Sequence, residues 1–317
     1  MKRIGNLYQK IYSLDNLRLA DEKARKGKRN SYGVRFHDRN REENLLKLHH
    51  ELKHKTFKTS PYEIFKIYEP KEREIYRLPY YPDRILHHAV MNVLEPVWMS
   101  IFTADTYSCI KGRGIHTCAE KLKKQLRDDV QGTRYCLKLD IKKFYPSVDH
   151  DVLKSILARK IKDKDLLWLL GEVINSAAGV PIGNYLSQYF ANLYLAYFDH
   201  WIKEEKSVKY YYRYADDLVI LAKTKEELHG LFLDIQQYLK INLKLRVKGN
   251  YQVFPVEERG IDFVGYRFWH THTLLRKRIK KNFAKAVARG EGKETLVSYL
   301  GWAKHCNSKN LIKKLAA

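Results

Sequence analysis

The stretch that most constrains this chain runs from Tyr210 to Leu221 and reads YYYRYADDLVIL. Aromatic and β-branched side chains on both sides of Ala215 favour two β-strands. Carboxylates are unfavourable in strands and common in turns, so the stretch predicts a β-hairpin with Asp216 and Asp217 at its tip. From these residues alone, the two aspartates are either ordinary turn residues or part of a chemical site. The rest of the chain has to separate these interpretations.

The composition favours a polyanionic partner. The 317 residues include 60 Lys and Arg against 36 Asp and Glu, which gives a formal net charge of +24. Because so much positive charge repels itself in a compact fold, we expect nucleic acid as the partner, with an anionic membrane surface as the second choice. The 23 Tyr and 5 Trp residues include rings that can stack on bases. Charge alone names no reaction.

The cysteines and the apolar runs bear on metal and membrane binding. Cys109, Cys118, Cys136 and Cys306 form no C-x-x-C pair, so free thiols are expected rather than a zinc site. The N-terminus has no apolar core of the signal-peptide type. The compact apolar run Leu166–Leu170 is far too short to cross a bilayer. We therefore expect a cytoplasmic protein without a membrane partner.

Hydrophobic periodicity predicts a mixture of helices and strands, which indicates the α+β class. The expected strands cover residues 62–69, 74–80, 135–141, 251–256 and 261–268. The expected helices cover residues 84–94, 115–129, 150–161, 163–176, 184–205 and 224–239, and a basic helical tail follows from Leu274. Asp83 and Asp149 are expected N-caps, and Thr224 with Glu227 has the spacing of a capping box.

A third carboxylate gives the hairpin aspartates a chemical interpretation. Asp140 ends the strand expected at 135–141. If that strand lies beside the hairpin, Asp140 converges with Asp216 and Asp217, and such carboxylates repel one another unless a cation lies between them. Hard oxygen ligands suit Mg²⁺, and two such ions about 3.5–4 Å apart stabilise in-line phosphoryl displacement. A basic chain with this acidic cluster fits nucleotidyl transfer.

Several motifs, in order along residues 60–305, resemble those of reverse transcriptases. Tyr214-Ala-Asp-Asp217 resembles their Y-x-D-D box, and Leu139–Tyr145 resembles the box with the other metal-binding aspartate. The further motifs are Lys71-Glu-Arg73, Pro82-Asp-Arg84, Pro181–Gln188 and Ile261–Tyr266. The resemblance implies an RNA-directed DNA polymerase with a right-hand polymerase fold. In that fold, the palm would be an antiparallel sheet packed on helices.

The resemblance also implies a domain division. Residues 1–134 are expected to form an N-terminal extension and fingers. Residues 135–272 are expected to form the palm, with fingers-side helices near 150–180. Residues 273–317 are expected to form a short helical thumb. The implied ligands are two Mg²⁺ ions, dNTP substrates, template RNA and the RNA–cDNA hybrid.

The loop before the long helix points to one branch of the family. Its form, Ile182-Gly183-x-x-x-Ser187-Gln188, resembles that of reverse transcriptases from diversity-generating retroelements. That branch implies a bacterial or phage-encoded enzyme that copies RNA into cDNA with errors at adenines. It also implies a small basic helical accessory protein. A group II intron-like enzyme, a defence-associated reverse transcriptase and a non-catalytic RNA-binding protein with this fold stay open as alternatives.

The resemblance assigns roles near the chemistry. Asp140 and Asp216 would bind both metal ions, Asp217 would be more peripheral, and the carbonyl of Ile141 would complete the site. Lys248 would protonate the leaving pyrophosphate, with Lys244 as the alternative. The ring of Tyr145 would exclude a 2′-hydroxyl, with Phe144 as the alternative.

Further residues are expected to contact the nucleotide, template or primer. Lys71 and Arg73 would hold the triphosphate, or else form an exposed charged turn. Ile182 and Gly183 would contact the incoming nucleotide. Because Ile182 offers no hydrogen bond where many accurate relatives have Gln, it predicts low fidelity, unless it only packs. The residues expected at template or primer are Arg84, Ser187, Gln188, Tyr214, Arg276, Lys277 and Arg278. Ser187 and Gln188 could instead only shape the helix, and the thumb cations could be a solvated face.

Overall fold

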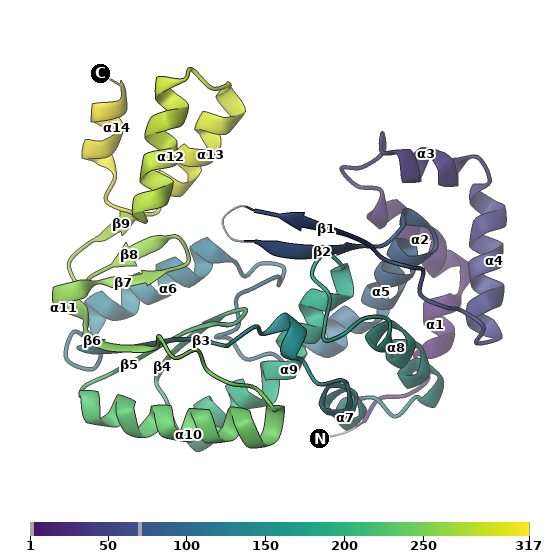
Figure 1. Cartoon of the computed structure of the whole chain (residues 1–317), viewed down its shortest axis with the longest axis horizontal. Helices are drawn as coiled ribbons and strands as arrows, with labels where there is room; N and C mark the ends of the chain where they lie inside the picture. Colours follow the sequence, from purple (N-terminus) through teal and green to yellow (C-terminus); the bar gives the residue numbers. More distant parts are fainter. Residues whose placement is uncertain (1–2, 69–71, 317) are drawn as a thin grey trace. The chain divides into compact units, whose positions relative to one another are not determined.

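The computed structural model describes residues 3–68 and 72–316, which fold into two compact units (Figure 1). Unit 1 comprises the described residues of Met1–Phe102, Lys143–Tyr197 and Asn242–Leu245. Unit 2 comprises those of Thr103–Lys142, Phe198–Ile241 and Arg246–Ala317. The expected boundaries of fingers, palm and thumb stay a prediction.

Unit 1 begins with a helical bundle. Its helices are α1 (Tyr8–Tyr12), α2 (Leu14–Ala24), α3 (Tyr32–Asp38), α4 (Arg41–Lys53) and α5 (Ile85–Met99), and the π-helical turn η1 (Tyr80–Arg84) leads into α5. Ser13 caps α2 by accepting a hydrogen bond from the backbone N–H of Asn16. Leu17, Ala20 and Ala24 recur along one face of α2 and are buried where α2 packs against α5. The bundle is therefore held by an apolar stripe of helical period.

The rest of unit 1 carries a hairpin and further helices. Strands β1 (Glu63–Ile67) and β2 (Arg73–Arg77) pair in antiparallel register, and most of their residues are exposed. The elements after residue 143 are η2 (Tyr145–Ser147), α7 (His150–Lys160), α8 (Lys164–Asn175) and most of α9 (Tyr185–His200). Asp149 caps α7 as predicted, because its carboxylate accepts from the N–H of Val152 at 3.0 Å.

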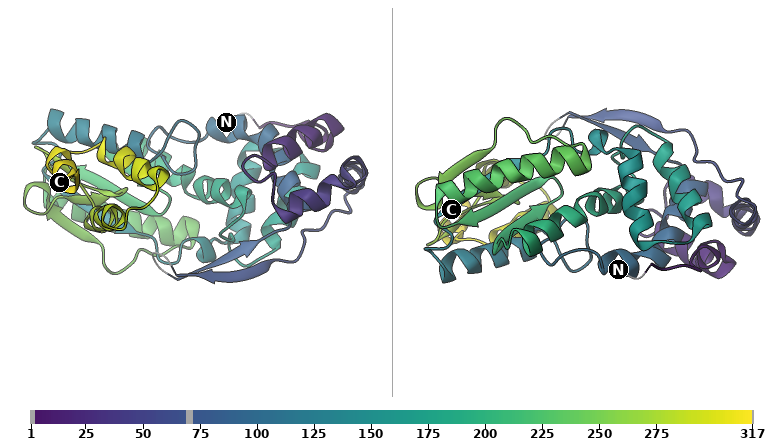
Figure 2. Two further views of the ribbon diagram at one scale, coloured as in Figure 1. Left: turned by 90° about the horizontal axis from the view of Figure 1, so that it is seen from above. Right: turned by 90° about the horizontal axis from the view of Figure 1, so that it is seen from below.

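Unit 2 is organised around a four-stranded antiparallel sheet of order β4-β5-β3-β6. Its strands are β3 (Tyr135–Asp140), β4 (Tyr210–Tyr214), β5 (Asp217–Ala222) and β6 (Gln252–Pro255). Helix α6 (Ile115–Asp128) packs Cys118, Leu122 and Leu126 into the core that includes Tyr210 and Tyr212 of the sheet. Helix α10 (Lys225–Leu243) lies on the opposite face (Figures 1 and 2). A turn of π-helix, η3 (Trp201–Glu205), precedes β4.

A small sheet and three helices complete unit 2. The helical turn α11 (Val256–Arg259) leads to the sheet β7 (Ile261–Phe263), β8 (Tyr266–Phe268) and β9 (Thr273–Leu275). The strand expected at 261–268 is two paired strands, as in the hairpin that the motif Ile261–Tyr266 resembles, because Val264 and Gly265 both have positive φ and reverse the chain between β7 and β8. Helices α12 (Lys277–Ala288), α13 (Lys293–Ala303) and α14 (Lys309–Ala316) follow.

The predicted α+β class is confirmed, since both units combine antiparallel strands with helices. The predicted cap of α5 is wrong. The helix begins at Ile85 without a side-chain cap, and Asp83 instead accepts a hydrogen bond from the N–H of Ser60 at 3.0 Å. Among the described residues, no helix combines the length and the apolar character that a bilayer crossing requires.

Candidate active site

The hairpin predicted from YYYRYADDLVIL is present and lies inside the main sheet of unit 2. Strands β4 and β5 pair with Tyr214 opposite Asp217, so Ala215 and Asp216 form the tight turn between them. Ala215 has a φ of 54°, a left-handed conformation that a two-residue hairpin turn requires. Asp216 therefore lies at the tip, and Asp217 is the first residue of the returning strand.

The strand that ends at Asp140 lies beside this hairpin, which meets the condition for the three carboxylates to converge. In the antiparallel pairing of β3 with β5, Asp140 is directly opposite Asp217. The backbone N–H of Ile141 donates to the carbonyl oxygen of Asp216 at 3.2 Å, which ties the end of β3 to the turn. Opposed residues on neighbouring strands have Cβ atoms about 4.5–5.5 Å apart. The sheet register thus brings the three carboxylates to one end of β3 and β5.

Two lysines partly balance the charge of these carboxylates. The Nζ of Lys248 lies 2.5 Å from Oδ1 of Asp140, and the Nζ of Lys138 lies 3.9 Å from Oδ2 of Asp217. Burial and the neighbouring charge of Asp140 raise the pKa of Asp216 to about 6. Burial raises the pKa of Asp217 to about 7, although Lys138 opposes the shift. Ionisation of either carboxyl group is therefore unfavourable in this site.

The donor set of this site fits a hard cation. One oxygen of Asp217, Oδ1, is buried and has no hydrogen-bond partner among the described residues. A buried acceptor without a donor is unfavourable, and a cation would satisfy it. The described part of the chain holds no group of three or more His, Cys, Asp or Glu side chains already arranged around one metal position. Asp140 would therefore have to exchange its ion pair with Lys248 for a metal.

The structure separates the two candidate general acids. Lys248 lies beside β3, since its backbone N–H donates to the carbonyl oxygen of Asp140 at 2.9 Å and its side chain contacts the same residue. Lys244 pairs instead with Asp149 in unit 1, with 2.6 Å between Nζ and Oδ2. Of these two candidates, Lys248 is thus the one that contacts a carboxylate of the site. Its role in proton transfer stays a prediction.

A buried ion pair that the sequence reasoning missed supports the hairpin from behind. Arg213 of β4 and Asp199 of α9 are both fully buried, and the guanidinium contacts the two carboxylate oxygens at 2.7 and 2.5 Å. Nη1 of Arg213 also donates to the carbonyl oxygen of Ala215 at 3.1 Å. Asp199 further accepts from the hydroxyls of Tyr211 and Thr106. The pair therefore anchors the turn that carries Asp216.

Tyr145 and Phe144 have different environments in unit 1. Phe144 is buried, with 2% of its surface exposed, whereas Tyr145 is half-buried at the start of η2. The two rings meet edge to face, with 5.5 Å between their centroids. Of the two, Tyr145 is the ring that a ligand can reach. The expected discrimination against a 2′-hydroxyl by Tyr145 stays a prediction.

The loop Ile182–Gly183 is built against the strand β2. The N–H of Tyr76 donates to the carbonyl oxygen of Ile182 at 2.8 Å. Gly183 has a φ of 123°, and a Cβ at this position would lie 2.8 Å from the carbonyl oxygen of Tyr76. Only glycine tolerates both the conformation and the approach. The loop is thus pinned to β2 by its backbone.

A cavity of about 510 Å³ opens beside this loop within unit 1. Among its lining residues are Arg84, Ile182, Gly183 and Gln188. Ser187, by contrast, is buried inside the fold, with 4% of its surface exposed. The structure therefore brings Ile182, Gly183 and Gln188 to one cavity. Ser187 does not line it, and its burial agrees with the alternative that Ser187 only shapes the helix.

Of the expected fingers residues, Arg73 and Arg84 lie in different elements. Lys71 lies outside the described residues. Arg73 is the exposed first residue of β2. Arg84 is half-buried in η1, and its Nε has no hydrogen-bond partner among the described residues. Of the two that the structure describes, Arg84 lines the cavity beside Ile182 and Arg73 does not.

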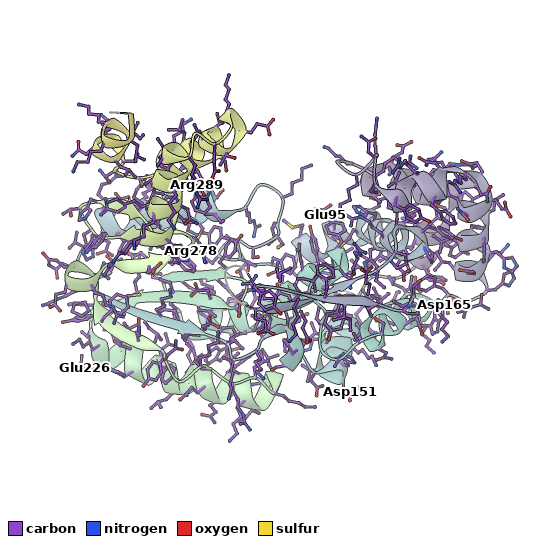
Figure 3. The ribbon with its side chains drawn as sticks, turned by 45° about the horizontal axis from the view of Figure 1, so that its top comes forward. Glu95, Asp151, Asp165, Glu226, Arg278 and Arg289 are labelled. Carbon is purple, nitrogen blue, oxygen red and sulfur yellow. The ribbon has the colours of Figure 1, made fainter. Side chains whose placement is uncertain are left out.

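The expected thumb cations lie around the start of α12 (Figure 3, which labels Arg278). Arg276 pairs with Asp262, with 2.5 Å between Nε and Oδ1, while Lys277 and Arg278 are exposed. A cavity of about 420 Å³ in unit 2 includes Tyr214, Asp217, Arg276 and Arg278 in its lining. Unit 2 therefore places two of the three thumb cations beside the strand that carries Asp217.

The combination of this fold and the carboxylate-bearing hairpin is that of a right-hand polymerase. Residues 69–268 match the family model described as reverse transcriptase (RNA-dependent DNA polymerase). The chain therefore belongs to the reverse transcriptase family, and the expectation of an RNA-directed DNA polymerase is confirmed at the level of the family.

The chain is similar to several proteins of known name. Protein YkfC of Escherichia coli is 26% identical over 271 residues, which cover 70% of this chain and 69% of that protein. The group II intron-encoded protein LtrA of Lactococcus lactis is 25% identical, over 52% of this chain and 29% of LtrA.

Solved structures of telomerase share the fold. Apo telomerase from Candida tropicalis has a TM-score of 0.52 and 13% identity, over 71% of this chain and 50% of that chain. Telomerase from Candida albicans, solved with a fragment of telomeric RNA, also has a TM-score of 0.52, with 12% identity over 74% of this chain and 51% of its own. The chain thus spans about half the length of the telomerase chains that it matches. The likeness supports the right-hand polymerase fold.

Proposed function

We propose that this protein extends a DNA strand on an RNA template, with the chemistry at Asp140, Asp216 and Asp217. The observation that carries the proposal is the sheet register, which places Asp140 opposite Asp217 and beside the turn of Asp216. The family match supports the reaction. The net charge of +24 supports a nucleic-acid substrate.

In this proposal, the residues of the chain position the reacting groups. Bound Mg²⁺ would activate the attacking hydroxyl and neutralise charge on the phosphates. Asp140 and Asp216 would hold the metal ions, with the buried Oδ1 of Asp217 as a further acceptor and the carbonyl of Ile141 as another. Lys248, whose ammonium group contacts Asp140, would donate a proton to pyrophosphate.

The substrates and partners follow from the same arrangement. Tyr145 would lie against the sugar and select dNTPs. Arg73 and Lys71 would hold the triphosphate, because guanidinium groups suit bidentate phosphate contacts. Template RNA and the RNA–cDNA hybrid would contact Gln188, Arg84 and Tyr214, together with the thumb cations Arg276, Lys277 and Arg278. In this division, residues 273–317 act as the thumb.

We further propose that the enzyme belongs to the diversity-generating branch and works in a bacterial cytoplasm with a small basic accessory protein. The loop form Ile182-Gly183-x-x-x-Ser187-Gln188 supports this assignment. Low fidelity at template adenines follows from the branch, and Ile182 contributes packing without a directional hydrogen bond. The similarity to LtrA supports a group II intron-type enzyme as the second candidate.

The first experiment tests the reaction. Purified wild type should extend a DNA primer on an RNA template only with Mg²⁺ present, and Asp216→Ala/Asp217→Ala should abolish extension while RNA binding is retained. Asp151→Ala, which removes an exposed carboxylate from α7, serves as the control and should keep full activity. Extension by the double variant would refute the assigned site.

The second experiment tests the branch. The cDNA that wild type and Ile182→Gln make on one template is sequenced, and errors are counted at each template base. The diversity-generating assignment predicts an excess of errors at adenine in wild type and fewer in the variant. Equal accuracy at all bases would favour the intron-type candidate. An adenine excess that Ile182→Gln leaves unchanged would place the cause of the errors elsewhere.

A further inference from the structure

Helix α3 of unit 1 exposes two aromatic rings that the proposed chemistry does not use. Tyr32 is 75% exposed and Phe36 is 58% exposed. They are one helical turn apart and stack, with 6.0 Å between ring centroids and 22° between ring planes. The opposite face of α3 supplies the core residues Val34 and His37. The two rings therefore form a surface feature rather than part of the core.

The surroundings of the two rings are basic. Lys26, Lys28, Arg29, Arg35 and Arg39 are all exposed, and none of them forms an ion pair with a described carboxylate. The guanidinium of Arg39 lies over the ring of Phe36, 5.7 Å from its centroid.

The acidic residue of α3, Asp38, is neutralised by Arg25, with 2.9 Å between Oδ1 of Asp38 and Nη2 of Arg25. The surface around the rings thus combines aromatic faces with unpaired positive charge.

This surface continues toward the cavity beside Ile182. Lys26 lines that cavity together with Arg77 and Arg84. A Cβ added to Gly33 of α3 would lie 3.0 Å from the Cβ of Tyr80, so α3 packs closely on η1, which ends at Arg84. The charges of Arg84 and, to a smaller extent, Arg77 act on Lys28, and together with partial burial they lower the pKa of its ammonium group. Basic side chains of the segment before α3 therefore lie near the cavity that Ile182 and Gln188 line.

We propose that α3 is a stacking platform for unpaired bases of single-stranded RNA. In this arrangement Tyr32 and Phe36 stack on the bases, and the five cations around them bind the phosphates. The inference rests on the proposed function, because the RNA would be the template approaching the cavity beside Ile182.

The surface chemistry favours single-stranded RNA over other occupants. Every base has two flat faces that an aromatic ring can cover, and single-stranded segments leave those faces free, whereas a duplex stacks them internally. A protein partner would need a larger apolar area than two rings provide. A surface with this much unpaired positive charge also requires a strongly negative partner.

The test measures RNA affinity separately from catalysis. Dissociation constants are measured by fluorescence anisotropy for full-length wild type and variants, with an unstructured labelled RNA and with an RNA duplex of equal length. Tyr32→Ala/Phe36→Ala should weaken binding of the single strand by about tenfold or more, because stacking contributes on the order of 1–3 kcal/mol per base. Binding of the duplex should change by less than about twofold, because its bases offer no free face.

Two further variants make the result specific to the rings. Tyr32→Trp/Phe36→Trp keeps flat aromatic faces and should retain wild-type affinity for the single strand. Leu233→Ala/Ile241→Ala removes two side chains of similar exposure from α10, 65% and 67%, and should have no effect. Loss of affinity in this control as well would show a general effect of surface apolar groups and would overturn the proposal.

The remaining outcomes are equally decisive. Unchanged single-strand affinity in the Tyr32→Ala/Phe36→Ala variant overturns the platform. If that variant instead changes the oligomeric state in light scattering while RNA affinity is kept, the surface binds protein and the proposal is wrong. Failure of wild type to extend any primer would refute the proposed function without altering the binding result.

Discussion

Replacing Asp199 by Asn should strongly destabilise unit 2. The change is isosteric, so it creates no cavity, but it removes the charge that faces Arg213. Both side chains are fully buried, and two nitrogen–oxygen contacts of 2.7 and 2.5 Å join them. An unpaired buried guanidinium costs about 3–5 kcal/mol. We therefore expect Asp199→Asn to lower the free energy of unfolding by that amount.

Urea denaturation followed by circular dichroism measures this loss. The double replacement Asp199→Leu/Arg213→Met removes both charges and should be less destabilising than Asp199→Asn, because no charge is left buried. Asp234→Asn breaks the exposed pair with Lys206, whose atoms lie 2.7 Å apart, and should cost at most about 1 kcal/mol. A loss below about 1 kcal/mol for Asp199→Asn would refute the reasoning, since it would mean that Arg213 finds other compensation.

Three other predictions concern unit 1 and the metal site. Burial, assisted by the charges of His88 and Arg84, lowers the pKa of His87 to about 3. In the unfolded chain, the His87 imidazole takes up a proton near pH 6.5, so the free energy of unfolding should fall by about 2 kcal/mol from pH 8 to pH 5. Urea titrations at both pH values should show a smaller fall in His87→Gln, and equal falls in the two proteins would contradict this. Gly183→Ala should lower the free energy of unfolding in urea by about 1–3 kcal/mol. Gly171→Ala in α8, whose Cβ would meet nothing nearer than 4.0 Å, should not lower it, and equal effects would refute the constraint on the loop. Mg²⁺ at ten times its dissociation constant should raise the free energy of unfolding of wild type by about 1.4 kcal/mol. The variant Asp216→Asn/Asp217→Asn should show no such rise, and an equal rise in both proteins would place the ion elsewhere.

The elements that the sequence predicted well depend on local chemistry. The hairpin at YYYRYADDLVIL follows from β-prone residues on both sides of a turn, and the cap at Asp149 follows from a carboxylate just before a periodic segment. Asp83 has the same local pattern and fails as a cap, because its carboxylate is buried and accepts from Ser60 in the preceding segment. A residue 23 positions away decides the outcome, and periodicity contains no such information.

The candidate site shows the same division between local and distant contributions. Asp140, Asp216 and Asp217 could be selected by residue type and motif, and β-pairing then brought them together. The partner of Arg213 could not be selected, although Arg213 lies inside the quoted stretch, because Asp199 is on a helix and nothing in the spacing of 14 residues links the two. The alternation of β4 gives a partial signal. Tyr210 and Tyr212 face the core below α6, so Arg213 falls on the opposite face and needs a buried counter-ion there.

Two charge clusters of unit 2, one fully buried around Arg213 and one partly exposed around Asp217, differ in how well their charges are matched, and the contrast supports the assignment of the active site. Around Arg213, positive and negative groups are matched and the carboxylate oxygens of Asp199 are satisfied by several donors. One hairpin turn away, Asp216 and Asp217 have raised pKa values and Oδ1 of Asp217 has no donor. The fold thus neutralises the carboxylate of Asp199 fully, whereas it only partly balances the carboxylates of Asp216 and Asp217. Such local cost is expected where a ligand completes the structure, because the energy of the unmatched carboxylates becomes binding energy for a cation.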